Sequence, residues 1–214
     1  MINDKAELVL AIEAAIGNGS LALFSDGKLI AEVAGDQSVS RANELLPAID
    51  LILRSHKIKA TMLSRIVVGA GPGSFTGIRV AVSTALGLAA PLTLPVNLIS
   101  SLEAIAASSP DDRFFAAIPL GRERICVQNF IRDSAGLRAV SVPEVWAESD
   151  LVDTVRRASG DRWIVHHSIF STIAEADRDP ITDCGEGIAT PIGFASIRQS
   201  VSNLETPLFV GRQR

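Results

Sequence analysis

The sequence predicts an α/β protein made of two related halves, each with a mixed sheet flanked by helices. Stretches typical of strands alternate with stretches of helical period along the chain. A strand–turn–strand–turn–strand pattern near the start returns weakly in the second half, where Ile131 takes the place of Phe24. The polar segment Ser108–Arg113 lies between the two patterns, so we expect domains at residues 1–108 and 109–214.

The first half begins with three strands and continues with helix–strand units. Asn18-Gly19 and Asp26-Gly27 are turn signals between the strands. A serine at position 100 or 101 is the expected N-cap of the last helix. The expected strands are Leu8–Glu13, Ser20–Ser25, Lys28–Val33, Ile66–Gly69 and Pro95–Ile99, and the expected helices are Arg41–Ser55, Ile78–Ala90 and Ser100–Ala107.

The second half repeats the three strands and then continues with a shorter set of elements. The turn before its third strand contains Asp133 and Gly136, both frequent in turns. The expected strands are Phe114–Ile118, Arg124–Ile131, Leu137–Val142 and Trp163–His166, and the expected helices are Ser149–Ser159, Ile169–Ala176 and Ile188–Val201.

The composition argues against several classes of protein. Hydrophobic residues make up 47% of the chain, enough to fill a core, and a net charge of -4 does not suit unaided binding of nucleic acid. The longest uncharged apolar run, Val80–Ser101, is interrupted by two prolines, so we expect no membrane span. The N-terminus lacks the basic region of a signal peptide, and Cys126 and Cys184 form no CxxC pair. These features predict a cytoplasmic protein with reduced thiols.

A glycine-rich loop follows the strand at Ile66–Gly69 and opens the next helix. It is either a tight turn with a capping hydroxyl or a cradle for phosphate, because glycine lets backbone N–H groups approach a ligand. It is not a P-loop, and Thr76 stands where GxGxxG has its third glycine. The turn is favoured, with Ser74 or Thr76 as the cap and with Gly73 and Gly77 required for backbone reasons. The loop residues that could contact a nucleotide are Gly71, Pro72, Gly73, Ser74, Phe75, Thr76 and Gly77.

The residues needed for hydrolase or metal chemistry are not arranged in any familiar pattern. Ser74 lies on a strand-to-helix turn, as a nucleophile would, but the GxSxG pattern is missing. The histidines are His56, His166 and His167, and the last two are adjacent, so at most one of them can face a site. There is no HExxH or HxxxH pattern and no cysteine pair. We therefore predict no catalytic residue and no metal site.

Two helices of the first half have too few polar residues for ordinary surface helices. The polar residues of Arg41–Ser55 share a narrow wedge, and Ile78–Ala90 carries one charge and a row of small residues. Small residues let a second helix approach closely and so increase dispersion contacts. We expect a helical protein–protein interface, and the alternative is that both helices are buried within the subunit. The expected interface residues are Leu45, Ile49, Ile52, Arg79, Ser83, Leu86, Gly87 and Ala90.

The string GPGSFTGIRVAVSTALGLA resembles the TsaB family, also called YeaZ. The neighbouring strings NELLPAID and LISSLEAIA are similar to that family's helix and serine-capped segment, and the resemblance covers residues 8–107 best. It implies the two-domain actin-like fold of the sugar kinase and Hsp70 superfamily, which agrees with the internal repeat.

The resemblance also implies a non-catalytic role. Members of the family pair with the TsaD subunit, which carries out the transfer, and work with the TsaE ATPase to put threonylcarbamoyl on adenosine 37 of tRNA. The two helices of the N-terminal domain form the pairing surface, and we expect a homodimer when the protein is alone. The resemblance implies contact with tRNA only through the complex, no cofactor of its own, no membrane partner, and ATP or ADP only at the complex interface.

Three polar segments depart from the family pattern. The Asp-Thr-Ser-like turn after the first strand is replaced by Glu13–Ala15, and the His-Ser-Glu before the first helix is replaced by Arg41–Asn43. The Asp-Ala-Arg-Arg-like segment of the second domain is replaced by Pro119–Arg122. These changes weaken the case for a nucleotide site but leave the small-residue row intact. The alternatives are a small phosphotransferase that uses the loop at residues 71–77, and a homodimeric protein that has left the tRNA pathway.

Overall fold

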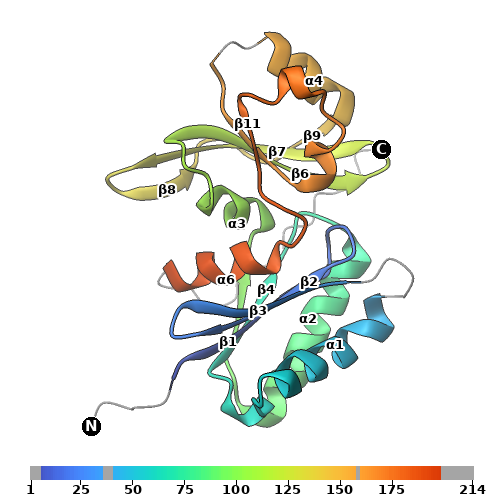
Figure 1. The fold of residues 1–214 in the computed structure, drawn as a ribbon, viewed down its shortest axis with the longest axis vertical. Coiled ribbons are helices and arrows are strands. Elements are labelled where there is room, and N and C mark those ends of the chain that lie inside the picture. Colours follow the sequence, from blue (N-terminus) through green and yellow to red (C-terminus); the bar gives the residue numbers. More distant parts are fainter. Residues whose placement is uncertain (1–5, 36–40, 158–159, 199–214) are drawn as a thin grey trace.

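The computed structural model describes residues 6–35, 41–157 and 160–198 of the chain. Two mixed sheets are stacked, with helices between them and on their outer faces (Figure 1). The α/β fold class with mixed sheets flanked by helices is therefore confirmed.

The first sheet has five strands, which are β1 (Leu8–Glu13), β2 (Ser20–Ser25), β3 (Lys28–Ala34), β4 (Arg65–Gly69) and β5 (Val96–Ile99). Their order in the sheet is β3-β2-β1-β4-β5. The central β1 is antiparallel to β2 and parallel to β4. All six residues of β1 are buried, because this strand has neighbours on both edges and helices on both faces.

Four helices cover the two faces of the first sheet. On one face lie α1 (Arg41–Ser55) and α2 (Phe75–Ala89), and on the other lie α3 (Ser101–Ala107) and α6 (Ala189–Arg198) (Figure 1). Although α6 comes from the second half of the sequence, it contacts β1, β2 and β4. The predicted division into domains at residues 1–108 and 109–214 stays a prediction, since α6 joins the two halves.

The second sheet contains β6 (Arg113–Gly121), β7 (Arg124–Asp133), β8 (Gly136–Ala139), β9 (Glu144–Ala147), β10 (Trp163–Val165) and β11 (Ile181–Asp183). Its order is β11-β10-β6-β7-β8, and β9 also pairs with β7. Two helices, α4 (Glu148–Arg157) and α5 (His167–Phe170), bury Leu151, Val155 and Ile169 in a cluster with Trp163 on one face of this sheet. Short 3₁₀ helices occur at Ala60–Met62, Ala90–Leu92 and Glu175–Asp177.

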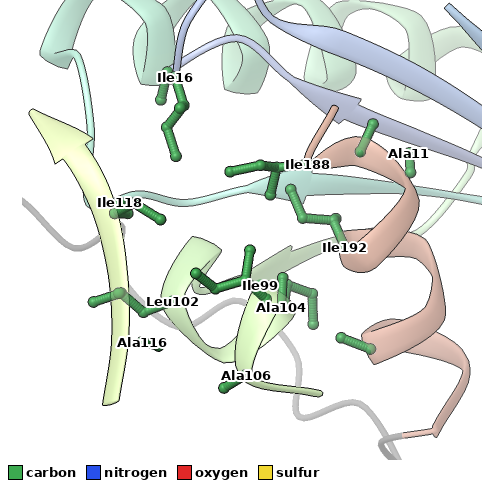
Figure 2. Close-up of a cluster of buried hydrophobic side chains, with 14 of the residues drawn as sticks. Ala11, Ile16, Ile99, Leu102, Ala104, Ala106, Ala116, Ile118, Ile188 and Ile192 are labelled. Atoms are coloured by element: carbon green, nitrogen blue, oxygen red, sulfur yellow. The ribbon is translucent and has the colours of Figure 1, made fainter. Parts of the chain in front are cut away.

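One buried apolar cluster lies between the two sheets, and we call it the central cluster. It combines side chains of β1, β2 and β4 with side chains of β6, β7 and β10, and the residues of α3 and α6 lie between them. Figure 2 shows part of this cluster, with Ala11, Ile16, Ile99, Leu102, Ala104, Ala106, Ala116, Ile118, Ile188 and Ile192 labelled. The inner faces of both sheets are thus buried in one continuous core.

Polar contacts of two arginines add to this core. The guanidinium of Arg132 on β7 donates hydrogen bonds to the carbonyl oxygens of Ala106, Ala107 and Ser109, at 3.3, 3.4 and 3.1 Å. Ala106 and Ala107 are the last two residues of α3, and Ser109 follows the helix. Arg132 therefore holds the second sheet to a helix of the first half. Arg65 on β4 donates in the same way to the carbonyl of Ser196 in α6, at 3.4 Å.

Two predicted helices differ from the observed ones. α2 begins at Phe75 rather than at Ile78, because Ser74 is its N-cap. The predicted helix at Ile169–Ala176 is wrong, since α5 ends at Phe170. The hydroxyl of Thr172 donates to the carbonyl of Ile169 at 2.7 Å, and such bonds compete with the helical pattern. The expected helix at Ile188–Val201 is observed as α6, and its last predicted residues lie outside the described part of the chain.

Two strands were not expected, and one is shorter than expected. β9 has four residues and β11 has three, too few for an alternating pattern to be recognised. The predicted strand at Leu137–Val142 is observed only up to Ala139. The chain then turns before β9, and the polar groups of Ser141 bond to Gln128 and Asn129 of β7.

Two helical glycines in different surroundings provide a matched test of the contact between α6 and β2. A Cβ atom added at Gly193 would overlap the ring of Phe24, whereas one added at Gly87 would have no atom within 4 Å. Gly193→Ala should destabilise the fold by about 1–3 kcal/mol, because the ring must move. Gly87→Ala should stabilise it by up to about 1 kcal/mol, because alanine is the better helix former. Urea denaturation followed by circular dichroism measures both, and equal stability of the two variants would contradict the close packing of α6.

Candidate functional site

The glycine-rich loop between β4 and α2 is tied to two other segments by backbone hydrogen bonds. The N–H of Ser74 donates to the carbonyl of Ala15 at 2.8 Å, and the N–H of Ser101 donates to the carbonyl of Gly71 at 2.8 Å. The loop therefore lies between the turn that follows β1 and the start of α3. Both of these hydrogen bonds join the loop to the protein's own backbone.

Gly73 and Gly77 are the positions where this loop meets the turn after β1. A Cβ atom at Gly77 would overlap the carbonyl oxygen of Ala14. A Cβ atom at Gly73 would lie 2.7 Å from the Cβ of Ala15 and 2.9 Å from its carbonyl oxygen. Such distances leave no space for a side chain, so the sequence needs glycine at both positions. The sequence predicts that both glycines are required by the path of the backbone, and this close approach gives the physical reason.

Ser74 has the role of a helix cap in this structure. Its Oγ accepts a hydrogen bond from the N–H of Gly77 at 3.3 Å, which satisfies one of the free donors at the start of α2. Of the two candidate caps, Ser74 is thus the one observed. Thr76 is exposed, as is Phe75, whose side chain keeps 55% of its surface accessible.

Glu13 closes the turn that follows β1. Its side chain lies in the protein interior, with 1% of the residue exposed. The Oε1 atom accepts hydrogen bonds from the N–H of Ala15 and from the N–H of Ile16, the second at 2.9 Å. Backbone donors that could bind a phosphate at this turn are therefore used by the protein's own carboxylate.

The outer surface of α1 and α2 is the second candidate site, and we call it the outer face (Figure 1). Its large apolar residues are unusually exposed, at 52% for Leu46, 63% for Leu51, 55% for Phe75 and 46% for Leu86. Between them α2 presents small residues, and nothing lies within 4 Å of a Cβ added at Gly87. The exposed residues of this face are Leu46, Pro47, Asp50, Leu51, Arg54, Phe75, Thr76, Arg79, Ser83, Leu86, Gly87 and Ala90. An exposed apolar surface of this kind is typical of an interaction site.

Three of the predicted interface residues are wrongly placed. Leu45, Ile49 and Ile52 are exposed by only 8%, 3% and 2%, because this side of α1 packs on the first sheet. They belong to the protein's own core and cannot contact a partner in this conformation. Leu46 and Leu51 lie on the outer face instead. The one signal that could have identified them is their position beside the polar wedge that contains Asp50.

The five predicted interface residues of the second helix are accessible to a partner, and their role in an interface stays a prediction. Arg79, Ser83, Leu86 and Gly87 are exposed along α2, and Ala90 is exposed just after its end. On the opposite side of α2, Ile78, Ala81, Ala85 and Ala89 are buried. By length and composition alone the segment Phe75–Leu92 could cross a membrane. In this fold one side of it covers the first sheet.

The charges of the outer face are few. The Cζ of Arg79 lies 4.9 Å from the centre of the Phe75 ring, a cation–π contact one helical turn along α2. On α1 the Nε of Arg54 lies 2.8 Å from the Oδ1 of Asp50. Pro47 and Leu51 also border a cavity of about 310 Å³ between α1 and the first sheet, which Glu44 and Val33 help to line.

The two adjacent histidines have structural partners. His166 is buried, its Nδ1 accepts from the N–H of Ser168 at 3.2 Å, and its Nε2 lies 3.0 Å from the carbonyl oxygen of Glu186. Burial lowers the pKa of His166, which favours the neutral ring that these contacts need. A hydrogen bond to Asp183 at 2.7 Å raises the pKa of the half-buried His167. Within residues 6–35, 41–157 and 160–198, no group of three or more His, Cys, Asp or Glu side chains is arranged to hold a metal ion.

Neither cysteine has the surroundings of a reactive thiol. Burial raises the pKa of Cys126 to about 11 and that of Cys184 to about 12, so both thiols stay protonated at neutral pH. Both cysteines are free in this structure.

Several known sequences that are similar to this chain share descriptions that concern threonylcarbamoyladenosine in tRNA. The family described as "TsaD: tRNA N6-adenosine threonylcarbamoyltransferase" matches residues 34–119. The chain is 35% identical over 100 residues to the "tRNA threonylcarbamoyladenosine biosynthesis protein TsaB" of Bacillus subtilis, which covers 47% of this chain and 44% of that protein. It is 29% identical over 163 residues to the protein of the same name from Escherichia coli, covering 73% and 69%. Against the Haemophilus influenzae protein of that name, identity is 37% over 103 residues, and the chain spans 42% of its length.

Comparison with solved structures supports the fold. The structure described as "YeaZ from Pseudomonas aeruginosa" superimposes with a TM-score of 0.67 at 18% identity, covering 95% of this chain and 100% of that one. A second Pseudomonas aeruginosa structure, described as similar to peptidase YEAZ, gives a TM-score of 0.68 at 19% identity, covering 96% and 100%. The two stacked sheets and their helices are thus the fold of these proteins.

The glycine loop yields a test that separates packing from ligand binding. Gly77→Ala should cost about 2–4 kcal/mol of unfolding free energy, because the new methyl group meets a backbone carbonyl that cannot rotate away. Ser74→Ala should cost only about 1 kcal/mol, the value of one capping bond. Urea denaturation gives both numbers. If Ser74→Ala proves the more damaging change, the loop is not held by the contacts described above.

Proposed function

This chain belongs to the TsaB (YeaZ) family, and we propose that it acts in the biosynthesis of threonylcarbamoyladenosine in tRNA. We propose further that it is a non-catalytic subunit, which pairs with a TsaD-like transferase and works with a TsaE-like ATPase on adenosine 37. The observation that carries this proposal is the outer face, where four large apolar side chains are about half exposed or more. Such a surface stabilises a complex when a partner covers it.

The glycine loop supports a role without chemistry. The N–H of Ser74 donates to the turn after β1, and Gly73 and Gly77 pack against that turn. The carboxylate of Glu13 accepts hydrogen bonds from the N–H groups of the same turn. The central cluster buries apolar side chains of both sheets together with α3 and α6 (Figure 2). On this proposal the chain has no cofactor of its own, ATP or ADP lies only at the complex interface, and tRNA is met only through the complex in the cytoplasm.

The two alternatives make different use of the same features. A small phosphotransferase would need the loop at residues 71–77 open to phosphate, which the packing of Gly73 and Gly77 disfavours. A homodimeric protein outside the tRNA pathway would use the outer face for a second copy of the chain. The proposal therefore needs one experiment on the partner and one on nucleotide turnover.

The first experiment tests the outer face. Gly87→Leu and Ser83→Trp should each weaken binding to the TsaD protein of the same organism by at least about tenfold, since a large side chain forces the two surfaces apart. Isothermal titration calorimetry measures the affinity. Val142→Trp, at a position that is 73% exposed in the second half, is the matched control and should bind as wild type. If Gly87→Leu and Ser83→Trp also bind as wild type, the outer face is not the docking surface.

The second experiment tests for chemistry. The purified chain should not hydrolyse ATP, because its loop glycines pack on its own backbone and Glu13 is bonded to the turn. Release of phosphate is followed with and without Mg²⁺. Turnover that Glu13→Ala abolishes would support the phosphotransferase instead.

A further inference from the structure

Arg79 is the one charged residue of α2, which otherwise contains apolar residues, small residues and threonine. It is exposed, and it lies in the row of residues that forms the outer face. Its guanidinium rests over the ring of Phe75, with Cζ 4.9 Å from the ring centre. This cation–π contact favours a position of the charge next to the Phe75 ring.

The positive charge of Arg79 is not compensated by a carboxylate of the described chain. Ion pairs within 4.0 Å join other residues, and among the described residues none includes Arg79. α1 contains two acidic residues. Asp50 pairs with Arg54 at 2.8 Å, and Glu44 borders the cavity between α1 and the first sheet. Among the described residues of the outer face, Arg79 is therefore a cation with no carboxylate within 4.0 Å, whereas Arg54 is paired with Asp50.

A partner that covers this face takes Arg79 out of water. A buried charge without a counterion is costly, whereas a charge that meets a carboxylate at the interface contributes to specificity. In the described part of α1 and α2, a second copy of the chain has two carboxylates that could meet Arg79, those of Asp50 and Glu44. The first of these is already paired with Arg54. Of these two carboxylates, only that of Glu44 is outside the ion pairs of the described chain, so self-association through this face offers Arg79 few counterions.

We propose that Arg79 is a specificity-determining residue, which selects a partner helix that carries a carboxylate among apolar side chains and disfavours a second copy of this chain. This inference rests on the proposed function, because it assumes that the outer face docks another subunit. It adds the kind of partner surface that fits: an apolar helical surface with an acidic side chain opposite the Phe75–Arg79 pair.

The test uses the full chain and the TsaD protein of the same organism as the probe. Arg79→Met keeps most of the side-chain length over Phe75 but removes the charge, and it should weaken binding about tenfold and reduce its dependence on NaCl concentration. Arg79→Glu should weaken binding further, by roughly a hundredfold, because it places like charges together. Arg79→Lys keeps the charge and should retain most of the salt dependence. Self-association, measured by analytical ultracentrifugation, should be unchanged or stronger in Arg79→Met.

Gly87→Leu separates failure of this inference from failure of the proposed function. If Gly87→Leu abolishes binding while Arg79→Met and Arg79→Glu bind as wild type, the outer face docks TsaD but Arg79 does not select it. If Gly87→Leu and both Arg79 variants bind as wild type, the outer face is not used and both proposals are wrong. If Arg79→Met weakens self-association as strongly as it weakens TsaD binding, Arg79 serves contact in general, and its proposed role in selection is overturned. Thermal unfolding of the Arg79 variants, which should match wild type, checks that the substitutions at this exposed position leave the fold intact.

Discussion

Burial of the central cluster is the constraint on which the rest of the structure depends. Both sheets place apolar side chains on the face that meets α3 and α6, so neither sheet buries its inner face without the other. Apolar burial is non-directional, so by itself it does not fix the position of the second sheet relative to α3. The hydrogen bonds from Arg132 to the end of α3 fix this position. With the inner faces buried in this way, the outer side of the first sheet is left to α1 and α2.

The position of α2 follows from its first turn. The loop before it is pressed against the turn after β1, and glycine at positions 73 and 77 makes that distance attainable. The helix then extends over the sheet with Ile78, Ala81, Ala85 and Ala89 buried, and its other side faces outward. One stretch of sequence is therefore structural at its beginning and forms an exposed surface along its length. These two roles are compatible because they use different sides and different ends of the helix.

Much of this arrangement could be predicted from the sequence, and the failures have physical causes. The turn signals at Asn18-Gly19 and Asp26-Gly27 located the first three strands, because turn chemistry is local. The burial of Leu45, Ile49 and Ile52 could not be predicted from a helix that is apolar on most of its circumference, because periodicity does not say which side meets the sheet. β9 and β11 were missed because they are held by pairing with β7 and β10, which no local pattern encodes. The role of Glu13 as the closing group of a turn also depends on tertiary placement, since its carboxylate is buried only when the helices and sheets have assembled.

The late position of α6 in the chain has a consequence for synthesis on the ribosome. The strands of the first sheet are complete once Ile99 has been added, but the helix that covers Phe24 on β2 ends at Arg198. At about 5–20 residues per second, the interval between these two points is on the order of ten seconds. Throughout that time the inner face of the first sheet has no α6 to cover it. The nascent chain therefore presents an apolar strand surface that a chaperone can bind, and the order of translation makes the first half of this protein the last to complete its core.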